Sequence, residues 1–333
     1  MTAAEARQQM REYGPGNPLV FSHVPKTAGT SLRLALEQSL QPAVFVQGVD
    51  CSLLAGYDNL DAISPAARAA FFLSPDELPA DATLVAGHIG PATTMARYPG
   101  ADHITFLRVP QVRIISQWLH GRSLIEFDLR HWGPAAEAFR VAWRPLREFL
   151  SHEMLAPNID NTITRFFAWP HPLLSRTEFI DPSDDDELFG AAIARLDTFG
   201  HVNIAENPNA ISELGAWLER DLPQMRANER TTVPRRMRPD LAAELDAPTR
   251  ALLDQRSRID VRVWTEIVRR VLADADPAVL LEDALGQSID RYTEMLKQSP
   301  DPLTLRRAVK IAYGFGVRLD PRRRRSRATS SRG

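Results

Sequence analysis

The sequence has almost no cysteine and no long apolar run. Cys51 is the only cysteine in the chain, so no disulfide can form within it, and a reducing compartment is favoured. No stretch approaches the roughly 18 uninterrupted apolar residues of a transmembrane helix. Residues 1–18 also lack the apolar core of a signal peptide. We therefore expect a cytoplasmic protein without a transmembrane segment.

Composition and charge are ordinary except at the C-terminal end. The chain has 333 residues, of which 44% are hydrophobic and 25% charged, as in globular proteins with a sizeable core. The net charge is −2, but six arginines and no acid lie within residues 321–333. We expect residues 319–333 to be a basic disordered tail, which allows weak contact with a membrane surface.

Apolar segments alternate between strand-like and helix-like patterns. Residues 19–23 (LVFSH) form a short apolar run that predicts a buried strand, and residues 31–40 have helical spacing. Further predicted strands are residues 43–46, 83–86, 103–107 and 198–204, and further predicted helices are 111–120, 145–153, 187–196 and 208–220. This alternation predicts an α/β fold with a central parallel sheet flanked by helices.

The later segments are predicted to be helical. Residues 241–273 and 277–313 carry helical patterns, so we expect a helical C-terminal portion. The predicted organisation is a flexible lead (1–18), an α/β domain (19–275), a C-terminal helical extension (276–318) and the basic tail (319–333).

The loop between the first predicted strand and helix suits an anion. It lies within HVPKTAGTSL, residues 23–32. Free N–H groups and the dipole at a helix start favour a negative charge, and Gly29 allows a close approach of the backbone. Thr27, Thr30 and Ser31 add hydroxyls, and Lys26 adds a positive charge. These residues predict a cradle for a phosphate or sulfate group.

This loop differs from the phosphate loop of nucleoside-triphosphate enzymes. That loop reads G-x-x-x-x-G-K-[ST], whereas here Lys26 precedes Gly29 by three residues. No serine or threonine follows a Gly-Lys pair to hold magnesium. The sequence therefore disfavours a magnesium-dependent kinase. It also shows no cluster of side chains with metal-ligand spacing, and no metal is expected.

A second motif joins the strand at 103–107 to the next helix. In HITFLRVPQVRIISQWLH, residues 103–120, Arg108 ends the strand and Pro110 is placed to start the helix. Ligands bind at the carboxyl edge of parallel sheets, where Arg108 can contact a phosphate and Ser116 can add a hydroxyl. An arginine at a strand end is by itself a weak signal, so the motif gains weight from the first one.

The two motifs together resemble those of sulfotransferases that use 3′-phosphoadenosine 5′-phosphosulfate (PAPS). The resemblance covers residues 19–273 and is strongest to the carbohydrate-type branch, which includes heparan sulfate 2-O-sulfotransferase-like and bacterial family 2 enzymes. It implies a P-loop-like sheet and binding of the 3′-phosphate by Arg108 and Ser116, with Arg113 structural. Val109 and Trp118 replace the usual Asp and Tyr. The implied ligands of the 5′-phosphosulfate are Pro25, Lys26, Thr27, Ala28, Gly29, Thr30 and Ser31.

The predicted catalytic residues are Lys26 and His88. Lys26 would stabilise the charge on the leaving phosphate, and a histidine has the ordinary pKa of a general base. His88 follows the strand at 83–86 within AGHIG, at the same sheet edge as the loop, and the resemblance also favours it. His23, which immediately precedes the loop, is the second candidate base, although we favour a structural role in which it orients the loop. We set His103 aside because it starts its strand at the opposite edge. Glu153 and Asp160 remain open as alternative bases.

The predicted reaction is sulfuryl transfer from PAPS to a hydroxyl, or less readily an amine. The acceptor would be a carbohydrate, a glycolipid or a small metabolite, and we expect no nucleic-acid partner. Side chains that suit a sugar surface are Trp118, His120, Arg122, His131, Trp132, Trp143, Arg144 and Trp169, although single tryptophans are more often core residues. The alternatives are a kinase-like enzyme and a non-catalytic nucleotide-binding module. The oligomeric state is left open.

Overall fold

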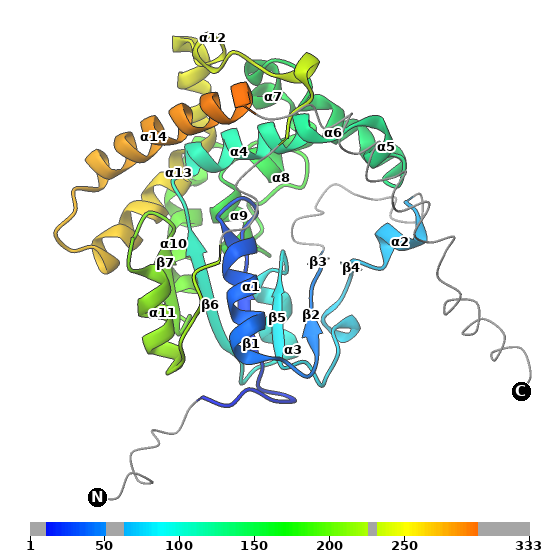
Figure 1. The fold of residues 1–333 in the computed structure, drawn as a ribbon, viewed down its shortest axis with the longest axis vertical. Coiled ribbons are helices and arrows are strands. Elements are labelled where there is room, and N and C mark those ends of the chain that lie inside the picture. Colours follow the sequence, from blue (N-terminus) through cyan, green and yellow to red (C-terminus); the bar gives the residue numbers. More distant parts are fainter. Residues whose placement is uncertain (1–10, 51–62, 226–231, 299–333) are drawn as a thin grey trace, which may run out of the picture.

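Five parallel strands form the central sheet of the computed structural model, which describes residues 11–50, 63–225 and 232–298 (Figure 1). The spatial order is β2–β5–β1–β6–β7, and every neighbouring pair is parallel. The strands are β1 (Leu19–Ser22), β2 (Phe45–Val46), β5 (Leu84–Gly87), β6 (Asp102–Leu107) and β7 (His201–Ile204). The predicted α/β fold with helices around a parallel sheet is confirmed.

The central strand β1 is apolar because both of its faces are covered. Leu19 and Phe21 pack on one side against α1 (Gly29–Leu40) and α11 (Ala210–Leu218). Val20 packs on the other side with Val85 of β5, in a cluster that also contains Tyr98. A short continuous apolar run is the pattern expected of a strand that is buried on both faces.

The remaining helices surround this sheet. They are α2 (Pro65–Arg68), α3 (Pro91–Arg97), α4 (Pro110–Ser123), α5 (Glu126–Leu129), α6 (Ala136–Val141), α7 (Leu146–Ser151), α8 (Ala156–Ile159), α9 (Thr162–Ala168), α10 (Asp185–Leu196), α12 (Leu241–Glu244), α13 (Ala247–Val271) and α14 (Pro277–Gln298). A second, two-stranded parallel sheet of β3 (Val49–Asp50) and β4 (Phe71–Phe72) was not predicted.

Several predicted boundaries shift. The strand predicted at 198–204 begins at His201, because residues 198–200 form turns that close α10. The helix predicted at 241–273 is divided into α12 and α13. Asp246 separates the two, since its side chain accepts a hydrogen bond from the Thr249 N–H and caps α13.

The C-terminal helices share the core of the α/β domain. Helix α14 lies along α4 (Figure 1), and Leu285, Tyr292 and Leu296 join the cluster that contains residues of α4 and α13. The described part of the predicted extension at 276–318 therefore has no core of its own. Residues 299–318 of that extension and the predicted tail at 319–333 lie outside the described residues.

Part of the predicted N-terminal lead is attached to the domain. The Tyr13 hydroxyl donates to Asp102 at the start of β6, and the Arg11 guanidinium also pairs with Asp102. Arg11 lies over the Trp217 ring of α11 at 4.0 Å. Residues 1–10 of the lead lie outside the described residues.

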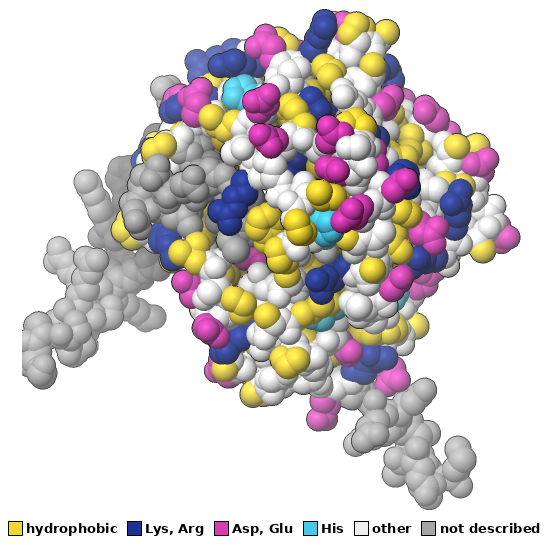
Figure 2. Space-filling view, turned by 180° about the vertical axis from the view of Figure 1, so that it is seen from behind, with side chains coloured by type: hydrophobic (Ala, Val, Ile, Leu, Met, Phe, Trp, Pro, Cys, Tyr) yellow, Lys and Arg dark blue, Asp and Glu magenta, His cyan; other side chains and the backbone are white. Residues whose placement is uncertain are grey.

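The described surface mixes both signs of charge. Figure 2 shows acidic and basic side chains interspersed with apolar ones over one face of the molecule. Within the ranges described above, the longest helices are too polar to form a membrane span.

Candidate functional site

The loop between β1 and α1 has an unusual backbone. Lys26 and Ala28 both have positive φ angles, 71° and 63°, which few side-chain-bearing residues adopt. The Thr27 hydroxyl is buried and donates to the Val24 carbonyl at 2.9 Å, so it holds the loop in shape. Thr27 could therefore contact a bound anion only through its backbone N–H. Such alternating backbone conformations direct N–H groups to a common side, where an anion can bind.

Helix α1 begins within the predicted anion loop, at Gly29. Thr30 and Ser31 lie in its first turn, and the Ser31 N–H donates to the Ala28 carbonyl at 3.3 Å. The Ala28 side chain makes no capping hydrogen bond, so the positive end of the helix dipole is not shielded by a side-chain cap. Pro25 opens the loop after the buried Val24. The structure thus brings all seven predicted loop residues to one helix start.

Gly29 is required for a reason that differs from the predicted one. A Cβ atom at this position would lie 2.1 Å from the Cδ2 atom of His23. The His23 ring stacks on Phe21, with ring centroids 5.3 Å apart, and also faces the His88 ring at 4.5 Å. The space beside Gly29 is therefore filled by His23 and not left open for a ligand. This arrangement agrees with the interpretation of His23 as a residue that orients the loop.

His88 is fixed in one tautomer. It directly follows β5, and its Nδ1 atom lies 2.7 Å from the His23 carbonyl oxygen. A carbonyl oxygen can only accept a hydrogen bond, so the proton must be on Nδ1. Nε2 of the neutral ring is then left as a hydrogen-bond acceptor. The pKa of His88 is lowered chiefly by burial and further by the Lys26 charge, against the raising effect of the His23 carbonyl. His88 is therefore a neutral ring with a basic Nε2.

Lys26 lies close to two other cations, Arg108 and Arg113. Burial, followed by the charges of Arg108 and Arg113, lowers the pKa of Lys26 to about 8. Lys26 therefore stays mostly protonated at neutral pH. Together with Arg108 and Arg113 it forms a local excess of positive charge. A bound anion would relieve the repulsion between these cations, and this favours phosphate or sulfate at the loop.

Arg108 connects the two predicted motifs. It follows β6, and its Nη1 atom donates to the Lys26 carbonyl at 3.2 Å. Its Nη2 atom donates to the Tyr292 hydroxyl at 3.1 Å, and Ser116 of α4 hydrogen-bonds to the same hydroxyl. The two residues predicted to bind one phosphate thus meet at one oxygen atom beside the loop. Tyr292 was missed, because nothing in the sequence relates a residue of α14 to this strand end.

Arg113 and Asp160 have structural roles. Arg113 is buried and donates to the Asn158 carbonyl and the Thr162 hydroxyl, which agrees with its predicted role; burial lowers the pKa of Arg113 to about 10. Asp160 is also buried and pairs with Arg165 at 3.0 Å. Because Asp160 also accepts from the Ile180 N–H, its carboxylate is fully engaged and is unsuited to act as the base.

Two other histidines, His120 and His103, lie in different surroundings. Burial, followed by the charges of Lys26 and His88, lowers the pKa of His120 to about 4, so His120 shares their surroundings. The sequence had indicated His120 only as one of several acceptor-side residues. His103, at the start of β6, packs against Phe199 at 5.4 Å, away from the carboxyl edge of the sheet. This position agrees with the exclusion of His103 as a candidate base.

Two of the side chains suggested for sugar contact are core residues. Trp118 is fully buried, and its indole N–H donates to the Arg144 carbonyl. The Arg122 guanidinium lies over the Trp118 ring at 4.7 Å and donates to the Met237 carbonyl. The preferred interpretation of Trp118 as a core residue is thus confirmed. The suggestion that Arg122 contacts an acceptor was wrong, because its guanidinium packs on Trp118 and donates to backbone carbonyls.

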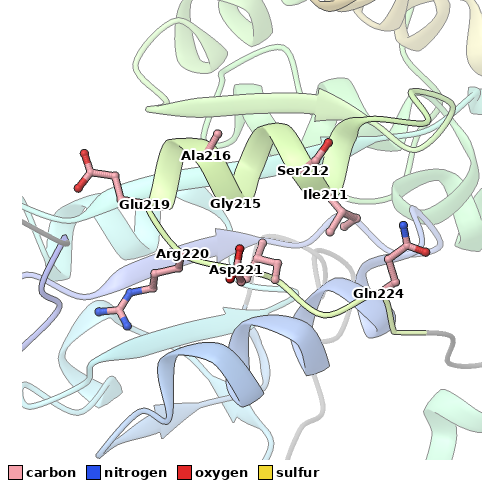
Figure 3. A pocket seen from close by; sticks show the side chains of 9 residues that line it. Ile211, Ser212, Gly215, Ala216, Glu219, Arg220, Asp221 and Gln224 are labelled. Carbon is pink, nitrogen blue, oxygen red and sulfur yellow. The ribbon is translucent and has the colours of Figure 1, made fainter. Parts of the chain in front are cut away.

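A hollow of about 550 Å³ lies elsewhere on the molecule. It is formed by α11 and the segment that follows it, with Ile211, Gly215, Glu219, Arg220 and Gln224 among its lining residues (Figure 3). No residue of the two predicted motifs lines it. The candidate site is thus defined by its converging side chains and not by this hollow.

Neither a metal-ligand group among the described residues nor a matching protein identifies the site. In residues 11–50, 63–225 and 232–298, no three His, Cys, Asp or Glu side chains are grouped so that they could hold a metal ion. No family model matches the chain, and no curated protein matches it. The function is therefore inferred from the loop between β1 and α1 and from His88, Arg108 and Ser116.

Proposed function

We propose that this protein is a sulfotransferase that moves a sulfuryl group from PAPS to a hydroxyl of a carbohydrate, glycolipid or small-metabolite acceptor, and less readily to an amine. The observation that carries the proposal is the contact of Arg108 with Lys26, which are 82 residues apart in the chain. This contact joins the loop that would hold one phosphate to Arg108 and Ser116, which would donate hydrogen bonds to a second phosphate. PAPS has the matching two groups, a 5′-phosphosulfate and a 3′-phosphate.

The loop and Lys26 would stabilise the leaving group. When the S–O bond to the 5′-phosphate breaks, its electron pair stays on the phosphate, which gains negative charge. Lys26 and the N–H groups at the start of α1 are placed to meet that charge. Thr27 and Arg108 hold the loop backbone through hydrogen bonds to the Val24 and Lys26 carbonyls, so its N–H groups need little reorganisation.

His88 is the proposed general base. The acceptor oxygen forms the new O–S bond while its proton passes to Nε2 of His88. The products are the sulfated acceptor, 3′-phosphoadenosine 5′-phosphate (PAP) and a protonated His88. The hydrogen bond from Nδ1 to the His23 carbonyl supports this role, since it keeps the lone pair on Nε2 and stabilises the cation that forms.

Calorimetric titration of PAP tests the nucleotide site. Adenosine 5′-monophosphate (AMP), which lacks the 3′-phosphate, is the reference ligand. We expect PAP to bind more tightly than AMP, and Arg108→Ala to weaken PAP binding by roughly tenfold to a hundredfold, the loss of one or two charged hydrogen bonds. Ser116→Ala should weaken PAP binding less, because it removes one hydroxyl.

Two controls make the titration specific. Because Arg108 also supports the loop, any loss of AMP affinity in Arg108→Ala measures damage at the 5′ side. Arg130→Ala removes an exposed guanidinium that lies over Phe127 and should leave both affinities unchanged. Equal affinity of the wild type for PAP and AMP would refute the proposed function. Tight PAP binding without turnover of PAPS by any acceptor would instead favour a non-catalytic nucleotide-binding module.

A further inference from the structure

Helix α14 reaches the candidate site through Tyr292. Its buried residues are Leu285, Tyr292 and Leu296, which form a single stripe against the helices beneath it. Tyr292 lies between the two leucines along the helix, and its hydroxyl contacts Arg108 and Ser116. The packing of the two leucines therefore holds a phenol oxygen at the strand end where the sequence predicts a phosphate.

The groups around this oxygen are donors. An arginine has only N–H donors, and the Ser116 and Tyr292 hydroxyls can each donate as well as accept. The exposed Arg291 guanidinium lies 5.1 Å from the centre of the Tyr292 ring and adds a second cation. The carboxylate of Glu206 accepts from the Val109 N–H and the Trp264 indole N–H, so its oxygens are engaged. Such a cluster is suited to an anion with several oxygens.

The electrostatics of Tyr292 agree with this geometry. Burial tends to raise the pKa of Tyr292, but the Arg108 charge, the Ser116 hydrogen bond and the Arg291 charge together lower it. The net lowering of the Tyr292 pKa thus shows that positive charge and hydrogen-bond donors surround the phenol oxygen.

We propose that Tyr292 is a third ligand of the 3′-phosphate, so that α14 completes the nucleotide site. This inference rests on the proposed function, because it assumes a ligand with that phosphate. A phosphate oxygen would replace the phenol oxygen as the acceptor of Arg108 and Ser116, and the Tyr292 O–H would then donate to the phosphate. The ring keeps its packing during this exchange, since only the hydrogen bonds change partners.

Tyr292→Phe is the decisive variant, because it removes the hydroxyl and keeps the ring. We expect PAP to bind roughly tenfold or more weakly to this variant, the effect of losing one hydrogen bond to a charged group. AMP affinity should stay within about twofold of the wild type. Tyr98→Phe is the matched control: the Tyr98 ring is also buried, and its hydroxyl donates to the Pro79 carbonyl outside the candidate site. It should leave the affinities for both nucleotides unchanged.

The other outcomes separate the possibilities. Unchanged PAP affinity in Tyr292→Phe would show that the hydroxyl is not a ligand, and tighter binding would show that it competes with the phosphate. Either result overturns the proposal while leaving the proposed function intact. A wild type that binds PAP and AMP equally refutes the proposed function itself.

Hydrogen exchange of the wild-type chain is a second measurement that needs no variant. Bound PAP should slow the exchange of backbone amides around Tyr292 in α14, and bound AMP should not. Exchange in α14 that is unchanged or faster with PAP would overturn the proposal even if Tyr292→Phe failed to fold.

Discussion

Replacing Gly29 by alanine tests how the loop is built. The new Cβ would lie 2.1 Å from Cδ2 and 2.2 Å from Nε2 of His23, so either the ring or the start of α1 must move. The ring is not free to swing away, because it stacks on Phe21 and faces His88. Overpacking of this kind costs about 1–3 kcal/mol of folding free energy. We expect the midpoint of thermal unfolding to fall by roughly 1–4 °C.

The same substitution should also weaken nucleotide binding. A displaced His23 would shift the carbonyl that holds His88, and a displaced helix start would shift the N–H groups of the loop. Calorimetry with PAP should therefore show weaker binding by Gly29→Ala than by the wild type. Gly190→Ala is the control, because Gly190 is a helical glycine with open space around its Cβ position. That change should be neutral or stabilising by about 0.5–1 kcal/mol.

A double variant distinguishes the clash with His23 from any other role of Gly29. In a His23→Ala background the obstructing ring is gone, so adding Gly29→Ala should cost nothing or slightly stabilise the chain. The two changes should thus be coupled by about 1–3 kcal/mol, measured by chemical denaturation. Equal destabilisation by Gly29→Ala in both backgrounds would refute the reasoning, since it would show that the ring is not what excludes the Cβ atom.

Two further predictions concern pH and proton position. Because the pKa of Lys26 is lowered to about 8, its charge is present below that pH and is lost above it, so PAP binding should be about tenfold weaker at pH 9 than at pH 7. The Lys26→Arg variant should lose this dependence, and a wild-type profile that is flat from pH 7 to 9 would contradict it. Imidazole nitrogen NMR should show His88 as the Nδ1–H tautomer, and His88 should stay neutral to lower pH than an exposed histidine, because burial lowers its pKa. A proton on Nε2 of the free protein would exclude His88 as the proposed base.

The local pattern of the sequence was sufficient for the fold class and for the two motifs. Apolar runs such as residues 19–23 have one stable solution, a strand covered on both faces, and β1 is that strand. His88 and Arg108 each follow a strand directly, and Lys26 lies in the loop after β1, so their placement at the carboxyl edge follows from the direction of a parallel sheet. Ser116 follows from the helical repeat of α4.

The reasons for individual residues needed the tertiary structure. The sequence does not show that His23 fills the space beside Gly29, because that contact depends on the stacking of His23 on Phe21. Nor does it show that Trp118 of α4 is buried, since helical spacing alone does not say what a helix packs against. Burial and contact partners depend on how distant segments of the chain pack. Local periodicity therefore reveals neither the contact of His23 with Gly29 nor the burial of Trp118.

The sequence by itself determined the five strands of the central sheet and the chemical groups that come after β1, β5 and β6. Only the tertiary structure decided which groups meet, because contacts between distant segments depend on how helices pack and not on local periodicity. Tyr292 is the clearest case: its contact with Arg108 spans 184 residues and depends on α14 docking through Leu285 and Leu296. The pairing of β1 with β5 likewise brings His88 Nδ1 to the His23 carbonyl, which leaves Nε2 as the unprotonated nitrogen.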